Sequence, residues 1–175
     1  MAVAPAERLE LKVWLRLLAC VSQGVGLLRR EIQEGFGATL PTFDLLAQID
    51  RRPRGPTMSE LSKRLMVSKG NVTDLVSRLE AKGLIERRSD PTDGRRQRIF
   101  LTPAGELLFA QLAPAHNACV AELMAGLDGA ALGELYEGLG RLKTAIALSE
   151  RRRQKRRGNG KAGHQGAAGA DPNEV

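Results

Sequence analysis

The chain has 175 residues, of which 42% are hydrophobic, 27% are charged and only 3% are aromatic. This composition suits one soluble domain whose core is built from aliphatic side chains, and it favours helices. No apolar stretch approaches the roughly 20 residues that a membrane span needs, and the N-terminus lacks a secretory pattern. We therefore expect a cytoplasmic protein with no membrane partner.

The formal net charge of +7 is unevenly distributed. Residues 51–98 hold 13 bases and 6 acids, whereas the rest of residues 1–150 is acidic overall. Residues 151–175 hold seven more bases and two acids. A compact basic segment between acidic flanks indicates a module that binds a polyanion.

Two helices are predicted ahead of the basic segment. Apolar residues recur at steps of three, four or seven from about Arg8 to Glu34, and residues 35–37 end this pattern. A second helix begins at Pro41, which suits a first helical position, and residues 51–56 break it. This second helix is expected to bury three apolar side chains, those of Phe43, Leu46 and Ile49.

A helix-turn-helix is predicted within the basic segment. Thr57 and Glu60 have the spacing of a capping box at the start of a short helix. Ser68 follows closely as the N-cap of the next helix, and Gly83 ends it. The apolar stripe of that helix consists of Val72, Leu75, Val76 and Leu79.

The polar face of the second helix is suited to the major groove of DNA. Its short hydrogen-bonding side chains and cations can pair with base edges and phosphates. The side chains on this face are those of Ser68, Lys69, Asn71, Thr73, Asp74, Ser77 and Arg78.

A basic β-hairpin is predicted directly after this helix. Leu84–Arg88 and Gln97–Leu101 are strand-like, and the turn residues DPTDG lie between them. Such a wing can place an arginine in the adjoining minor groove. We expect Asp93 to hold the guanidinium of Arg95 by a charge-assisted bond. The cations around the hairpin are Arg87, Arg88, Arg95, Arg96 and Arg98.

Two further helices and a tail complete the chain. Thr102 caps a helix with Pro103 at its first position, which runs to about Ala125, and Asp128 caps the last helix. That helix carries a heptad-like Leu stripe suited to a partner helix. The expected divisions are a dimerisation helix (1–40), a DNA-binding lobe (41–102), dimerisation helices (103–150) and a disordered basic tail (151–175).

The stretch MSELSKRLMVSKGNVTDLVSRLEAKGLIERRSDPTDGRRQRIFLTPAG resembles the core of the MarR family of bacterial regulators. The resemblance implies a mainly α fold, a winged helix-turn-helix with a two-stranded β-wing flanked by N- and C-terminal dimerisation helices. It also implies a homodimer that binds an inverted-repeat operator on double-stranded DNA as a repressor. Arg95 then takes the minor-groove role, Asp93 supports it, Arg96 lies beside it, and Ser68 to Arg78 supply the major-groove contacts.

The same resemblance implies release by a small anion, such as an aromatic carboxylate or an aryl- or acyl-CoA thioester. The segments WLRLL and GFGATLPTFDLLAQI are similar to those of regulators of aromatic catabolism. The candidate effector-binding residues are Trp14, Arg16, Arg30, Phe36 and Phe43.

Other classes of protein fit less well. The isolated histidines and the absence of a phosphate-binding glycine loop argue against an enzyme, a metal site or a cofactor. A thiol-based redox sensor would need a reactive cysteine, but Cys20 lies in an apolar sequence where we expect it buried and inert, and Cys119 lies far away in sequence. A nonspecific winged-helix module that binds DNA or protein stays an alternative, which salt dependence and sequence selectivity would separate.

Overall fold

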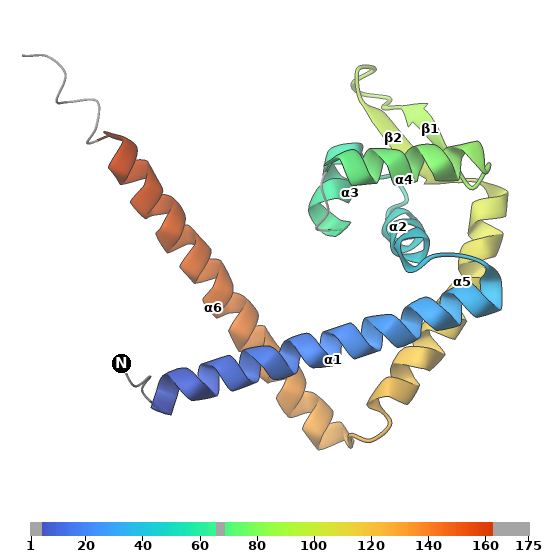
Figure 1. Cartoon of the computed structure of the whole chain (residues 1–175). Helices are drawn as coiled ribbons and strands as arrows, with labels where there is room; N and C mark the ends of the chain where they lie inside the picture. Colours follow the sequence, from blue (N-terminus) through green and yellow to red (C-terminus); the bar gives the residue numbers. More distant parts are fainter. Residues whose placement is uncertain (1–4, 66–68, 163–175) are drawn as a thin grey trace, which may run out of the picture. The chain divides into compact units, whose positions relative to one another are not determined.

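The computed structural model describes residues 5–65 and 69–162 (Figure 1). The two compact units of the chain, residues 1–123 and 124–175, are described separately. The helices and strands of the chain are α1 (Pro5–Phe36), α2 (Leu40–Asp50), α3 (Met58–Leu65), α4 (Lys69–Ala81), β1 (Ile85–Ser89), β2 (Gln97–Leu101), α5 (Pro103–Met124) and α6 (Gly129–Ala162). The strands form an antiparallel pair with Arg87 opposite Ile99. A mainly α winged helix-turn-helix is thereby confirmed.

Side-chain caps fix where most helices begin. The backbone N–H of Thr57 donates to Glu60 Oε2 at 2.8 Å, and the N–H of Glu60 donates to Thr57 Oγ1 at 3.3 Å, which confirms the capping box. Asp128 accepts from the N–H of Ala131 at 2.8 Å at the start of α6. The cap of α2 was not predicted: Thr39 accepts from the N–H of Thr42, which places Pro41 one residue inside the helix.

The end of α4 is a Schellman motif. The N–H of Leu84 donates to the carbonyl of Leu79 at 3.0 Å, and that of Gly83 donates to Glu80 at 2.9 Å. Gly83 has a φ of 69°, a conformation that residues with a Cβ adopt at a cost. This turn leads directly from α4 into β1, so only residues 82–84 separate α4 from the hairpin.

A hydrophobic core joins the hairpin to the helices around it. All elements from α1 to α5 contribute at least one buried side chain, and the predicted burial of Phe43, Leu46 and Ile49 is confirmed. The buried apolar residues are Ile32, Phe43, Leu45, Leu46, Ala47, Ile49, Leu61, Val72, Leu75, Val76, Leu79, Ile85, Ile99 and Leu112. The inner face of α4 and the first half of β1 are therefore fixed by the same core.

The first two-thirds of α1 expose apolar side chains. An 18-residue window within Arg8–Phe36 has a mean hydropathy of 1.4 and none of it is buried. By length and composition alone, α1 is long and apolar enough to cross a membrane, a test that a core helix of a soluble protein can also pass. Lys12 and Arg16 interrupt the run of apolar residues, so the sequence contains no long uninterrupted apolar stretch although the average hydropathy of this window is high.

The second unit contains α6, which exposes a stripe of apolar side chains. Leu135, Leu139 and Ile146 are each more than two-fifths exposed. The helix continues to Ala162, whereas the sequence suggests a disordered tail from Arg151, and that division of the chain stays a prediction. Residues 151–157 are all Arg, Lys or Gln, which are good helix formers, and extending an existing helix avoids the cost of nucleation.

Candidate functional site

The exposed side of α4 holds the described candidates for base contact. Asn71, Thr73, Ser77 and Arg78 are all exposed, on the face opposite the buried Val72 and Val76. Lys69 is the first residue of α4, whereas Ser68 lies outside the described residues. The helix therefore presents a polar face to the outside, as the sequence predicts.

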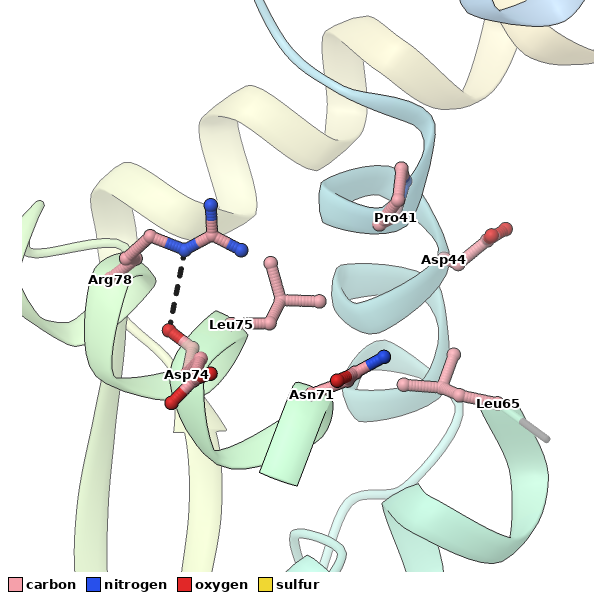
Figure 2. A pocket seen from close by; sticks show the side chains of 7 residues that line it. All are labelled: Pro41, Asp44, Leu65, Asn71, Asp74, Leu75 and Arg78. Carbon is pink, nitrogen blue, oxygen red and sulfur yellow. Dashed lines mark hydrogen bonds between the residues drawn. The ribbon is translucent and has the colours of Figure 1, made fainter. Parts of the chain in front are cut away.

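A cavity of about 320 Å³ is lined by some of these α4 residues but not by others (Figure 2). It lies between α4 and α2, and Asn71 and Arg78 line it together with Pro41, Asp44 and Asp74. Arg78 extends toward α2, and its Nε donates to the backbone carbonyl of Asp74 at 3.4 Å. Burial raises the pKa of Asp44, and the charge of His116 opposes this rise. Asn71 and Arg78 thus border α2, whereas Thr73 and Ser77 lie one helical turn apart on α4.

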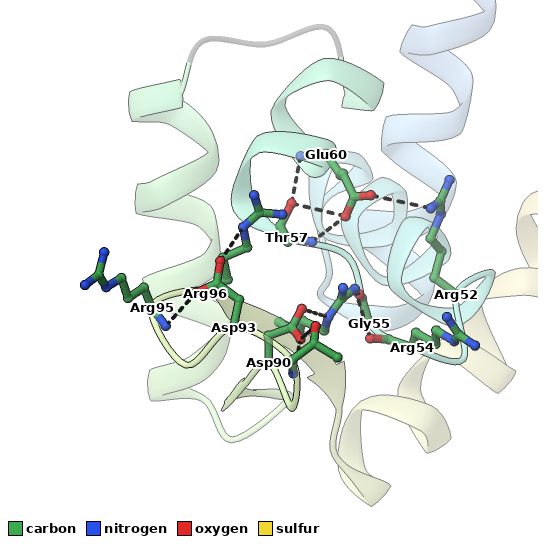
Figure 3. Close-up of polar contacts among 11 residues, drawn as sticks. Arg52, Arg54, Gly55, Thr57, Glu60, Asp90, Asp93, Arg95 and Arg96 are labelled. Atoms are coloured by element: carbon green, nitrogen blue, oxygen red, sulfur yellow. Dashed lines mark hydrogen bonds and ion pairs between the residues drawn. The ribbon is translucent and has the colours of Figure 1, made fainter.

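The tip of the wing differs from its predicted arrangement. Asp93 Oδ2 pairs with Arg96 Nε at 3.0 Å, and Asp93 Oδ1 accepts from the backbone N–H of Arg95 at 3.2 Å. The carboxylate therefore holds the guanidinium of Arg96 and only the backbone of Arg95, which corrects the expected pairing. A spacing of three residues allows the turn to fold Arg96 back, whereas the Arg95 side chain points away from the wing (Figure 3).

The guanidinium of Arg98 lies at the base of the wing, among acceptors from two segments. Its Nε donates to Asp90 Oδ2 at 2.6 Å and its Nη1 donates to the carbonyl of Gly55 at 2.9 Å. Hydrogen bonds from the hydroxyl and N–H of Thr92, and then from Arg98, hold the pKa of Asp90 well below its ordinary value. Arg98, counted in the sequence among the wing cations, is therefore engaged within the protein.

Arg87 connects the wing to α4. Its Nε pairs with Glu80 at 3.1 Å and its Nη2 donates to Ser77 Oγ at 3.4 Å. Arg88 pairs with Glu86 and lies over the ring of Phe100, 4.7 Å from its centroid. Neither acidic partner was singled out in the sequence. The i,i+7 relation of Glu80 to Arg87 gives no local signal, because it spans the end of a helix and the start of a strand.

The candidate effector-binding residues do not gather in one place. Trp14 and Phe36 both lie in α1, separated by about 33 Å at 1.5 Å per helical residue. Phe43 belongs to the core, where its ring stacks on His116 at 4.2 Å and on Phe109 at 5.9 Å. One protomer therefore cannot form a single pocket from all five predicted residues.

One predicted effector residue, Arg30, does line a cavity. This cavity, of about 470 Å³, lies between the end of α1 and the start of α2. The residues around it are Arg29, Arg30, Gln33, Glu34, Thr39, Leu40 and Pro41. Arg29 and Thr39 were missed, although the adjacent arginines and the N-cap threonine are visible in the sequence. Two guanidinium groups beside apolar Leu40 and Pro41 suit an organic anion.

The two cysteines have different surroundings. Cys20 is exposed, so the expectation that it is buried is wrong: the apolar side chains around it on α1 are themselves exposed. Cys119 is half-buried, and burial raises the pKa of its thiol, with Glu31 and Glu122 adding to the effect. A raised pKa disfavours the nucleophilic thiolate that redox sensing needs at Cys119.

The winged helix-turn-helix matches known proteins. Residues 36–96 match the model of the MarR family. A putative transcriptional regulatory protein for the hcr operon of Thauera aromatica is 33% identical over 65% of this chain and 68% of its own length. The chain spans 66% of the length of a related Bacillus cereus HTH-type regulator.

Solved structures of similar fold are also MarR family regulators. A MarR family regulator from Silicibacter pomeroyi has a TM-score of 0.71 at 30% identity, covering 82% of this chain and 99% of its own. Sco3205 from Streptomyces coelicolor, solved in complex with DNA, has a TM-score of 0.71 at 26% identity over 85% and 91% of the two chains. The chain thus shares both sequence and fold with transcription regulators rather than enzymes, and it belongs to the MarR family.

Proposed function

We propose that the protein is a homodimeric repressor that binds an inverted-repeat operator and is released by a small organic anion. The observation that carries the proposal is the placement of two DNA-reading elements on one core: the polar face of α4 and the outward-pointing Arg95 of the wing. The helix suits the major groove and the arginine suits the adjoining minor groove. Sco3205, of the same family, was solved with DNA, which supports this arrangement.

The exposed apolar surfaces support a homodimer. Leu11, Trp14 and Leu15 on α1 are each more than half exposed, and α6 carries its own exposed leucine stripe. Large apolar surfaces of this kind mark interfaces between proteins. A second copy would cover them, and it would supply a second half-site reader about one turn of DNA away.

The cavity between α1 and α2 supports an anionic effector. Its Arg29 and Arg30 can bind a carboxylate or phosphate, and Leu40 and Pro41 can contact a ring. CouR from Rhodococcus jostii, which shares the fold at 18% identity with a TM-score of 0.67, was solved bound to p-coumaroyl-CoA. An aromatic acid or its CoA thioester is the class of effector that we propose.

Selection of bound fragments from the source genome at near-physiological salt tests the DNA-binding part. We expect enrichment of one inverted repeat. Equal, salt-sensitive recovery of all fragments would mean that the basic surfaces bind only the DNA backbone, and the specific repressor would have to be abandoned.

Release from the enriched operator tests the effector. The probes are p-coumarate, p-coumaroyl-CoA and, as a control, uncharged p-coumaroyl methyl ester. We expect the anions alone to weaken operator binding, and we expect Arg30→Ala to abolish this response while keeping operator affinity. An anion response that survives both Arg29→Ala and Arg30→Ala would place the effector elsewhere.

A further inference from the structure

We propose that Arg98 is a positioning residue, which fixes the angle at which the wing leaves the lobe and so places Arg95 against DNA. This inference rests on the proposed role of Arg95 in DNA binding. Arg98 itself lies in β2, and its guanidinium joins the wing to the loop between α2 and α3. It is thus a link within the protein rather than one more cation of the wing.

Three acceptors surround the Arg98 guanidinium. They are Asp90 Oδ2 at 2.6 Å, the carbonyl of Gly55 at 2.9 Å and the carbonyl of Arg54 at 3.4 Å. Gly55 precedes Arg98 by 43 residues, so the contact connects segments that no local signal brings together. A planar fork with several N–H donors suits this set, because it can bond a carboxylate and backbone carbonyls at once.

The loop at Gly55 is built to lie against β2. The N–H of Ile99 donates to the carbonyl of Pro56 at 3.0 Å, and Thr57 forms an isolated bridge with Arg98. Gly55 has a φ of 65°, and a Cβ there would lie 2.7 Å from Phe100 Cζ and 2.8 Å from the carbonyl oxygen of Ile99. The acceptors for Arg98 therefore belong to backbone that is itself closely packed on the wing.

The other end of the link reaches the tip of the wing. Asp90 Oδ1 accepts from the N–H of Thr92 at 2.8 Å and from its hydroxyl at 2.7 Å. The N–H of Asp90 also donates to the carbonyl of Arg96 at 2.9 Å. One carboxylate thus joins Arg98 to the turn that carries Arg95, and movement at Arg98 would move that turn.

The low solvent exposure of the Arg98 and Asp90 side chains argues against a direct contact between Arg98 and DNA. The Arg98 side chain is 25% exposed and that of Asp90 only 4%, whereas Arg95 is exposed. A guanidinium whose Nε and Nη1 already bond within the protein would have to break this link in order to bind a phosphate. Arg98 is therefore expected to influence DNA binding through Arg95.

A double-mutant cycle on the selected operator tests this coupling. We expect Arg95→Ala to weaken binding about tenfold and Arg98→Gln about fivefold, while Arg98→Gln adds less than about twofold in the Arg95→Ala background. Arg98→Lys keeps the charge but loses the fork, so it should resemble Arg98→Gln. Arg88→Gln, in the same hairpin, is the matched control and should leave affinity within about twofold.

Three results from these variants would overturn the proposal. Multiplicative losses in the Arg95→Ala, Arg98→Gln double variant would mean that Arg98 acts independently of Arg95. Wild-type affinity of Arg98→Lys would mean that its charge alone matters. A loss of operator affinity that follows only a lowered melting temperature, equal in both backgrounds, would indicate a purely structural residue.

Hydrogen exchange on the free protein tests the link without DNA. We expect the amides of Asp90 and Thr92 to exchange at least about tenfold faster in Arg98→Gln, with α2 and α4 unchanged. Unchanged exchange at these amides would overturn the proposal even if no operator were found. If wild type selects no operator but Arg98→Gln loosens the wing, the repressor function fails and the link stands.

Discussion

The wing base (Gly55, Arg87, Asp90 and Arg98) and the wing tip (residues 91–96) use the same residue type in opposite ways. At the base, Arg87 bonds to Glu80 of α4, and Arg98 bonds to Asp90 of the hairpin and to the carbonyl of Gly55 in the loop before α3. At the tip, Arg95 points away from the protein, and Arg96 pairs with Asp93, three residues earlier (Figure 3). The base is held by contacts distant in sequence, and the tip by a local turn.

This difference shows how to read a cluster of arginines. A count of five cations in the hairpin suggests five candidates for DNA contact, but Arg87 and Arg98 are engaged within the protein, and Arg88 and Arg96 pair with acids of the hairpin itself. Buried or paired cations add little to the field that a polyanion meets, whereas an exposed one adds its full charge, screened only by salt. Affinity should therefore depend on the tip, and the orientation of the tip on the base.

Among the substitutions considered, we expect the largest change in the free energy of unfolding where the hairpin joins α5. Thr102 Oγ1 donates to the carbonyl of Gly83 at 2.6 Å, and a Cβ on Gly105 would overlap the carbonyl oxygen of Leu84. Gly105→Ala should lower the free energy of unfolding by about 3 kcal/mol, as overpacking does. Urea unfolding measures this. Gly133→Ala, with nothing near its Cβ, is the control and should stabilise α6 by about 0.5–1 kcal/mol.

At the tip, Arg95→Ala should reduce operator affinity about tenfold without changing the melting temperature. The slope of log affinity against log salt should fall by about 0.9 if one phosphate contact is lost along with the groove contact. Fluorescence anisotropy at several salt concentrations measures both quantities. An equal loss in Arg88→Ala would contradict the division between tip and base, because the Arg88 guanidinium lies over Phe100.

The residues at the start of α3 lie next to the loop at Gly55, which contacts the base of the wing. Thr57 and Glu60 form the reciprocal cap beside Gly55 and Pro56, and this cap lowers the pKa of Glu60, mainly through the backbone N–H of Thr57. Thr57→Ala should cost about 1 kcal/mol of stability, whereas Thr57→Ser should cost much less. Equal losses for both variants, in thermal unfolding, would show that the methyl group rather than the hydroxyl matters.

The smallest expected effect is the pH dependence of stability that arises from Asp90 and Asp44. Because the pKa of folded Asp90 is lowered, its contribution to stability is complete above its ordinary value of 3.8 and declines as pH falls below about 4. Asp44 has a raised pKa, so its contribution has the opposite sign and declines as pH rises through the folded value. Urea midpoints should show that Asp90→Asn flattens the acid loss of stability and that Asp44→Asn does not.

Most of the fold follows from local patterns in the sequence. The capping box at Thr57, the stop at Gly83 and the cap at Asp128 each involve residues within a few positions of one another, so spacing alone identifies them. The composition after Arg151 lacks apolar surface for a core and so suggests disorder, whereas the run of Arg, Gln and Lys at residues 151–157 has a high helix propensity.

The site was less predictable because its contacts are distant in sequence. The charge pattern identified the tip, but no spacing rule links Arg98 to Gly55, and the acid that holds Arg96 was assigned to its neighbour. Aromatic character also misled the choice of effector residues: Phe43 fills the core, whereas Arg29 and Thr39 line the cavity. In each case the partner from another element decides the role of the residue.

Pro41 lines both cavities beside α2, the one that faces α1 and the one that faces α4. A molecule that displaces the start of α2 on one side therefore changes the space next to Asn71 and Arg78 on the other. Linkage requires the exchange to be mutual: an anion that weakens operator binding by a given factor is itself bound more weakly, by that factor, once the operator is occupied. At a given anion concentration, free regulator would then be more fully occupied by the anion than operator-bound regulator.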